Sequence, residues 1–264
     1  MRFDGVGIGS FDLAAGINLL MATRDRGLPW ISANIYDRTG VRIFPPYRIV
    51  EYGDLEAAIV AVTDPLISSE AVEIRDAERE LSQLLPSLGH VDIIILLSSL
   101  PFQQTVELAE RHGQIDLAIT ADRHKKNLQP VHAGSALVFQ TAARGQYMGM
   151  FEAKWRNRPW MEDKSTEIET LKGQLASLSR QIARLAALPP DTGAEKAGSL
   201  QARKRQLLNR IDELENSVVS HSDEYLSTYR CTFIPLSASV RKDPAIEQVI
   251  RKADKRIREL RQPR

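Results

Sequence analysis

The chain has 264 residues, and 35 Lys plus Arg against 34 Asp plus Glu give a formal net charge of +1. This balance excludes a strongly basic nucleic-acid binder and an acidic disordered chain, so no nucleic-acid partner is expected. The only cysteine, Cys231, excludes an internal disulfide framework and a cysteine-rich zinc site. No run of 18 apolar residues occurs, so no membrane span is expected. Cysteine poverty, with no apolar leader after Met1, predicts a cytoplasmic location for this chain alone.

Residues 1–160 have the pattern of a layered α/β domain. The apolar runs 91–97 and 116–120 are typical of strands buried on both faces of a sheet. Between them and around them, helical and strand-like segments alternate, which predicts an α/β architecture. The expected helices cover 12–26, 71–85 and 103–111, and the further expected strands cover 29–35, 47–50, 55–62, 137–140 and 148–155.

Residues 161–228 predict an inserted antiparallel helical hairpin. Their apolar residues follow a heptad seam, which is typical of two paired helices. The apolar residues are Ile168, Leu171, Leu175, Leu178, Ile182 and Leu185 in the first helix and Leu200, Leu207, Leu208, Ile211, Leu214 and Val218 in the second. A turn at 189–193 closes the hairpin, so the strands 150–155 and 230–234 are expected to be neighbours. The α/β domain would then comprise 1–160 and 229–264, and the hairpin either decorates it or docks a protein partner or a second copy.

A last helix follows Asp243 and Pro244, which suit its N-cap and first position. Its apolar stripe comprises Ile246, Val249, Ile250, Ala253, Ile257 and Leu260. From residue 241 onward there are nine Lys or Arg against four Asp or Glu. We expect this helix to pack on the domain with its basic face in solvent, in preference to a nucleic-acid or membrane contact.

Asp122 and His124 are the strongest local candidates for chemistry, because they directly follow the predicted strand 116–120. Ligands usually bind at the carboxyl ends of such strands. An aspartate and a histidine two residues apart can both reach one metal ion. The alternative is a loop in which the two side chains only form hydrogen bonds. No dinucleotide-binding, P-loop or serine-hydrolase motif occurs elsewhere.

Several stretches, taken in order, resemble the 5'-nucleotidase branch of the calcineurin-like metallophosphoesterases. The segment 1–16, with Gly-Ser-Phe-Asp at 9–12, is similar to the family's G-N-H-E-F-D segment. Residues 28–37, with Ser-Ala-Asn at 32–34, are similar to its P-x-L-S-A-N-V strand. Residues 91–99 and 115–124 resemble the strands leading into its S-H and G-H-T-H motifs, and 138–149 resembles its V-V-Q-A-G segment.

The resemblance implies a two-metal phosphoesterase site, and the motif positions can be compared one by one. Ser10 stands where the family has a ligand asparagine, and Phe11 stands where it has a catalytic histidine. Ser99 replaces the histidine of the S-H motif. Asp122 takes the place of the first histidine of G-H-T-H, and His124 matches the last one. Hydroxyls and a phenyl ring are poor metal ligands, so we expect Asp122 and His124 to hold at most one divalent metal ion.

The family's first two metal motifs would lie before Met1, so the resemblance implies a two-sheet sandwich that is N-terminally incomplete in this chain. We expect coding sequence upstream of Met1, and family members are mostly exported, so a leader there would place the whole protein in the periplasm. Three hypotheses follow. In the first, the chain is a degenerate, non-catalytic binding or interaction module. In the second, it is a metal-dependent hydrolase of nucleotides or related phosphate esters with ligands from an upstream segment. In the third, it is an adaptor that acts through its helical hairpin.

Overall fold

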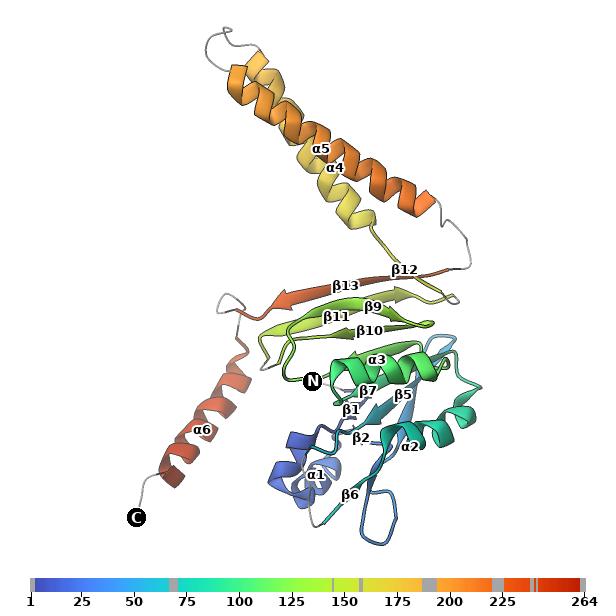
Figure 1. Ribbon diagram of the computed structural model, residues 1–264. Coiled ribbons are helices and arrows are strands. Elements are labelled where there is room, and N and C mark those ends of the chain that lie inside the picture. The colour runs from blue at the N-terminus through green and yellow to red at the C-terminus, as the bar shows by residue number, and fades with distance from the viewer. Residues whose placement is uncertain are drawn as a thin grey trace.

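A six-stranded mixed sheet forms the centre of the computed structural model (Figure 1). The structure describes residues 3–66, 71–143, 145–156, 159–186, 194–219, 226–237, 240 and 242–261. The strands of the central sheet, in spatial order, are β4 (Tyr47–Tyr52), β5 (Leu55–Val62), β7 (Ile93–Ser98), β8 (Leu117–Thr120), β10 (Ala136–Gln140) and β9 (Leu128–Ala133). The four inner strands are parallel, and the two edge strands β4 and β9 are antiparallel to their neighbours.

Helices cover one face of this sheet. They are α2 (Ala77–Leu84), the 3-10 turn η2 (Leu85–Leu88) and α3 (Phe102–Arg111). Leu81, Leu85 and Leu96 are fully buried between these helices and the sheet. Alternate side chains of β7 face two different cores, one on each face of the sheet. The apolar run is therefore buried on both faces, as the sequence predicted.

Three smaller sheets complete the described part of the fold, and the three-stranded one packs against the other face of the central sheet. Strands β11 (Tyr147–Lys154), β13 (Ser227–Pro235) and β12 (Trp160–Glu162) form one of them. Strand β1 (Val6–Gly7) pairs in parallel with β2 (Trp30–Ile31), and β3 (Ile35–Tyr36) pairs with β6 (Glu73–Ile74). The architecture is thus a mixed α/β fold with multi-stranded sheets and flanking helices, as the sequence predicted.

The expected pairing of 150–155 with 230–234 is confirmed. Met150 pairs with Thr232 in the antiparallel ladder of β11 and β13. Strand β12, which adds to the other edge of β13 in parallel, was not predicted. A three-residue strand is too short to show an alternating pattern.

Three predicted elements are divided in the structure. The expected helix 12–26 consists of the 3-10 helix η1 (Ser10–Ala15) and α1 (Ile17–Arg24), because Gly16 between them has φ +85°. The expected strand 29–35 is interrupted at Ser32 and Asn34, whose side chains form buried hydrogen bonds. The expected helix 71–85 begins only after Asp76, whose carboxylate accepts the Arg79 N–H as an N-cap.

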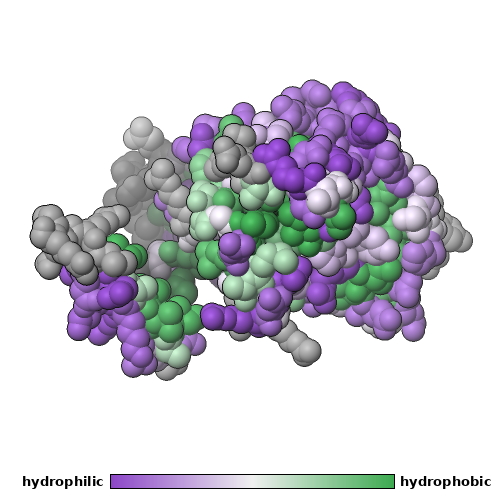
Figure 2. Space-filling view, turned by 90° about the horizontal axis from the view of Figure 1, so that it is seen from below, coloured by the Kyte–Doolittle hydropathy of each residue, from purple (hydrophilic) through white to green (hydrophobic). Residues whose placement is uncertain are grey.

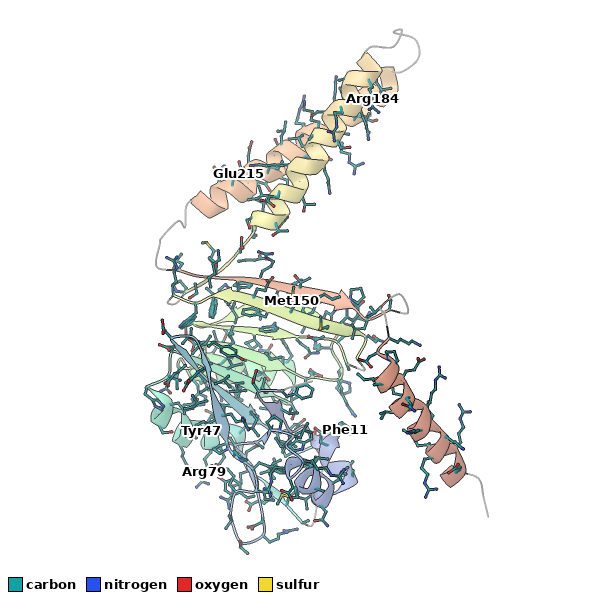
Figure 3. All side chains as sticks on the ribbon, turned by 180° about the vertical axis from the view of Figure 1, so that it is seen from behind. Phe11, Tyr47, Arg79, Met150, Arg184 and Glu215 are labelled. Atoms are coloured by element: carbon teal, nitrogen blue, oxygen red, sulfur yellow. The ribbon has the colours of Figure 1, made fainter. Side chains whose placement is uncertain are left out.

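Helices α4 (Ser165–Ala186) and α5 (Ala194–Val219) form a pair that extends away from the sheets (Figure 1). Leu178, Ile211 and Leu214 are buried in the seam. Ion pairs cross the seam on the outside, between Lys172 and Glu215 at 2.6 Å and between Arg210 and Glu167 at 3.3 Å. Figure 3 shows the polar side chains along both helices. The predicted turn at 189–193 lies outside the described residues.

Replacing residues 165–225 by a short Gly-Ser linker is expected to leave the α/β domain folded, since the α4–α5 pair satisfies its own seam. The linker must start after Asp163, because the Asp163 N–H donates to the Tyr229 carbonyl at 2.7 Å. Urea unfolding followed by circular dichroism should give a free energy of unfolding within about 1 kcal/mol of the parent. Loss of cooperative unfolding would show that the helices belong to the core. The division into 1–160 with 229–264 and a separate 161–228 stays a prediction that this experiment tests.

Among the described helices, none combines the length and the apolar character needed to cross a bilayer.

Candidate functional site

A cavity of about 210 Å³ lies where β5, β7 and β8 end. All five residues singled out in the sequence line it, namely Ser10, Phe11, Ser99, Asp122 and His124. They come from three separate segments of the chain: Ser99 and Asp122 with His124 follow the parallel strands β7 and β8, and Ser10 and Phe11 begin helix η1. The structure therefore gathers the predicted positions into one cavity, and their chemical roles stay predictions.

The first wall of the cavity is the turn that begins helix η1. The Gly9 N–H donates to the Asp12 carboxylate at 2.8 Å, which closes the turn. The Thr63 hydroxyl donates to the Ile8 carbonyl at 2.7 Å and ties this turn to the end of β5. Ser10 is buried at 5% exposure, whereas Phe11 is 53% exposed and lies at the surface in Figure 3.

The Asp122 carboxylate is held by backbone donors on both oxygens. Oδ1 accepts the His124 N–H at 2.8 Å, and Oδ2 accepts the Phe102 N–H at 3.1 Å. Burial of this group raises its pKa, but the two backbone N–H donors, together with the charges of His124 and Lys125, outweigh that effect, and the net pKa lies below the usual aspartate value. Asp122 is therefore an ionised structural anchor between β8 and the start of α3.

His124 and Phe11 share Arg123 as a neighbour. The Arg123 Nε donates to the His124 Nε2 at 3.0 Å, so this imidazole nitrogen is an acceptor. The Arg123 guanidinium carbon lies 4.8 Å from the centre of the Phe11 ring, in a cation–π contact. The Arg123 N–H thus engages one of the two imidazole nitrogens of His124.

Asp64 is the cavity residue that the sequence reasoning missed. It follows the end of β5 just as Asp122 follows the end of β8, and this equivalence was the available signal. The Asp64 N–H donates to the Ser99 hydroxyl oxygen at 2.8 Å. Burial, with a further contribution from the nearby negative charge of Asp122, raises the pKa of the Asp64 carboxyl.

A two-metal centre does not fit this set of donors. Such a centre needs enough anionic and imidazole ligands for two cations about 3.5–4 Å apart. Of the five predicted positions, Ser10 and Ser99 offer only neutral hydroxyls and Phe11 offers no ligand atom. Across the part of the chain that the structure describes, no three His, Cys, Asp or Glu side chains are placed to hold a metal ion together.

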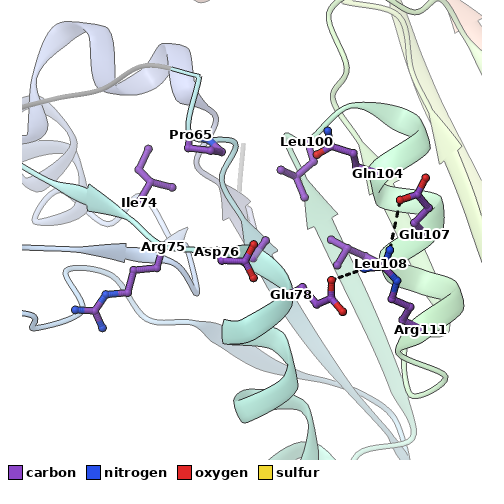
Figure 4. Close-up of a pocket in the computed structure, with 11 residues that line it drawn as sticks. Pro65, Ile74, Arg75, Asp76, Glu78, Leu100, Gln104, Glu107, Leu108 and Arg111 are labelled. Atoms are coloured by element: carbon purple, nitrogen blue, oxygen red, sulfur yellow. Dashed lines mark hydrogen bonds and ion pairs between the residues drawn. The ribbon is translucent and has the colours of Figure 1, made fainter.

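A second, wider cavity of about 590 Å³ lies between α2 and α3 (Figure 4). Its charged residues pair with one another, because Arg111 forms ion pairs with Glu78 and, at 3.6 Å, with Glu107. The pair with Glu78 joins the two helices across the cavity. The side chains are thereby engaged in holding the helices, and the smaller cavity remains the better candidate site.

Solved structures with a similar fold share low sequence identity with this chain. Thermus thermophilus sulfate thiohydrolase SoxB is 23% identical over 58% of this chain and 30% of its own, with a TM-score of 0.53. The calcineurin-like phosphoesterase YfkN of Bacillus subtilis is 18% identical over 57% of each chain, with a TM-score of 0.51. A 5'-nucleotidase precursor, also of Thermus thermophilus, is 19% identical over 58% of this chain and 36% of its own, with a TM-score of 0.52.

The chain spans less than two thirds of the length of each of these proteins. No family model and no curated protein matches the sequence. The likeness at these identities is a likeness of fold, and it agrees with the resemblance stated from the sequence. This chain has the α/β fold of the calcineurin-like phosphoesterases and 5'-nucleotidases.

Proposed function

We propose that this chain is a degenerate metallophosphoesterase scaffold that acts as a binding or interaction module and not as a hydrolase. The observation that carries the proposal is the incomplete donor set, because no three His, Cys, Asp or Glu side chains of the described residues are placed to hold a metal ion together. Asp122 accepts the backbone N–H groups of His124 and Phe102, which fix its carboxylate as a link between β8 and α3. Phe11, at the position of the catalytic histidine, cannot transfer a proton.

The helical pair α4–α5 is the element that we propose for the interaction. It extends away from the sheets, so it can reach a partner protein or a second copy without disturbing the α/β domain (Figure 1). Light scattering after gel filtration should then show self-association or partner binding in the full chain that the Gly-Ser replacement of 165–225 loses. If the full chain and the replacement variant form particles with the same number of copies and bind partners equally, the α4–α5 pair has no part in the interaction.

A precursor among the proteins of similar fold supports the further proposal of an exported, periplasmic protein.

The alternative is a metal-dependent hydrolase of nucleotides or related phosphate esters, with further ligands from residues outside this chain. One observation favours it: the negative charge of Asp122 contributes to the raised pKa of Asp64, so two carboxyl groups share the cavity. A divalent cation would relieve this repulsion. The alternative requires the remaining ligands to come from outside the described residues, which hold no group of three suitable side chains.

We expect this chain to release no phosphate from AMP or p-nitrophenyl phosphate above background, with or without Mn²⁺. Its activity should equal that of Asp122→Asn and His124→Ala, because no third His, Cys, Asp or Glu among the described residues is placed to complete a metal site with these two side chains. Asp54→Asn, in the exposed β4–β5 turn, is the matched control, and thermal melts verify that each variant is folded. Metal-dependent release that falls about 10²–10⁴-fold in the two site variants, but not in the control, would establish the hydrolase instead.

A further inference from the structure

Helix α6 (Pro244–Arg261) carries the longest exposed apolar stripe in the described part of the chain. Ile246, Val249, Ile250 and Ile257 are 60%, 66%, 53% and 47% exposed. Their spacing places them on one face of the helix, with Ala253 in the middle. Apart from Glu247, every described side chain of α6 is exposed. The sequence led us to expect this stripe to pack on the domain, and the structure leaves it open.

The arrangement of the molecule keeps this stripe accessible. Figure 1 shows α6 standing apart from both the sheets and the α4–α5 pair. In Figure 2 the hydrophobic atoms of α6 gather on one side of a small lobe, beside hydrophilic ones. A helix with four half-exposed aliphatic side chains in a row is unfavourable in water unless something covers them.

Positive charge is concentrated at the end of the chain that contains α6. Residues 241–264 hold nine basic and four acidic residues, whereas the whole chain holds 35 basic and 34 acidic residues. The rest of the chain therefore has an excess of acidic residues. Lys252 and Arg256 follow Val249 by three and seven residues, so they lie along one border of the stripe. Lys252, Lys255 and Arg258 have no ion pair among the described residues.

A second copy is a poor candidate for the cover. The stripe has four exposed aliphatic side chains, whereas each partner of a standard interface contributes about 20–30 residues. Nucleic acid is also a poor candidate, because it would use the basic residues and leave the stripe exposed. A surface that is apolar inside and negatively charged outside satisfies both features at once.

We propose that α6 binds the surface of a membrane containing anionic lipids, lying in the interface with its stripe in the acyl region. The long basic side chains at the border of the stripe then reach the phosphate groups of the lipids. The helix is too short and too charged to cross the bilayer, so the attachment is peripheral. The proposal is independent of whether the cavity at β5, β7 and β8 binds a ligand.

Co-sedimentation of the full chain with vesicles tests the proposal. We expect binding to vesicles of two parts phosphatidylcholine and one part phosphatidylglycerol, and little binding to phosphatidylcholine alone. The double variant Val249→Gln/Ile250→Gln should bind at least about tenfold more weakly, since each aliphatic side chain contributes by its burial. Glutamine keeps the helix, because its helix propensity exceeds that of valine and isoleucine. Lys252→Gln/Arg256→Gln should lose about tenfold, and added salt should weaken the parent in the same way.

Leu208→Gln is the matched control, because Leu208 is an exposed aliphatic residue, 40% exposed, on α5. It should bind vesicles like the parent. Equal binding by the stripe variant and the parent would overturn the proposal, as would equal binding to both kinds of vesicle. If the parent does not bind vesicles, and only the Val249→Gln/Ile250→Gln variant has a lower molar mass than the parent in light scattering, α6 is an interface between copies and the proposal is wrong.

Discussion

Replacing Gln140 by alanine is expected to lower the free energy of unfolding by about 3–5 kcal/mol. Gln140 ends β10, is fully buried, and holds the loop that carries Asp122. Its Oε1 accepts the Asp122 N–H at 3.0 Å, and its Nε2 donates to the Asp122 carbonyl at 2.8 Å. Alanine would leave both backbone groups buried without these partners and would open a cavity as well. Urea titration followed by tryptophan fluorescence measures the loss.

The variant Gln140→Glu separates hydrogen bonding from volume, because the two side chains have nearly the same shape. Burial beside Asp122 should raise the pKa of the new carboxyl above its unfolded value of about 4.3. Its folded form therefore favours the bound proton, and its stability relative to the parent should fall as the pH rises from about 4 through the raised pKa. Gln114→Ala is the control, since the Gln114 Nε2 makes a long bond of 3.4 Å to the Leu85 carbonyl. A loss in Gln140→Ala no larger than in Gln114→Ala would contradict the prediction.

Periodicity in the sequence was sufficient to predict an element where the conformation of that element depends mainly on its own residues. The run 91–97 is apolar at nearly every position, and β7 is buried on both faces as that pattern requires. The turn between 50 and 55 contains Gly53, which has φ +66°, and the predicted hairpin of β4 and β5 formed around it. The edge of the sheet where ligands bind was also predictable, because it depends only on the direction of the strands.

Features that depend on a distant partner were not predictable from the sequence. Strand β12 exists because β13, more than 60 residues later, offers it an edge. The raised pKa of Asp64 depends on burial and on Asp122, which follows a different strand. The stripe of α6 has the same spacing whether it packs on a domain or faces solvent, so its pattern predicted the helix and not its surroundings.

Replacing Trp160 by alanine is expected to lower the free energy of unfolding by about 3–5 kcal/mol, because this residue joins the two sheets. Trp160 is 4% exposed, although β12 contributes only three residues. Its ring packs against Phe151 at 6.0 Å, Tyr229 at 6.3 Å and Trp155 at 5.0 Å between ring centres. Its indole N–H donates to the Asp116 carbonyl at 3.1 Å, at the start of β8 in the central sheet.

Two further variants assign this loss to the ring and to the N–H. Trp160→Phe keeps most of the apolar contact but removes the indole donor, and it should cost about 1–2 kcal/mol. Trp155→Ala removes a ring that is only partly buried, so its cost should be clearly smaller than that of Trp160→Ala. Urea titrations of all three variants, followed by far-UV circular dichroism, allow the comparison. If Trp160→Ala unfolds no more easily than Trp155→Ala, the small sheet is held to the central sheet by Phe139 and Phe151, whose stacked rings lie 4.9 Å apart, and not by Trp160.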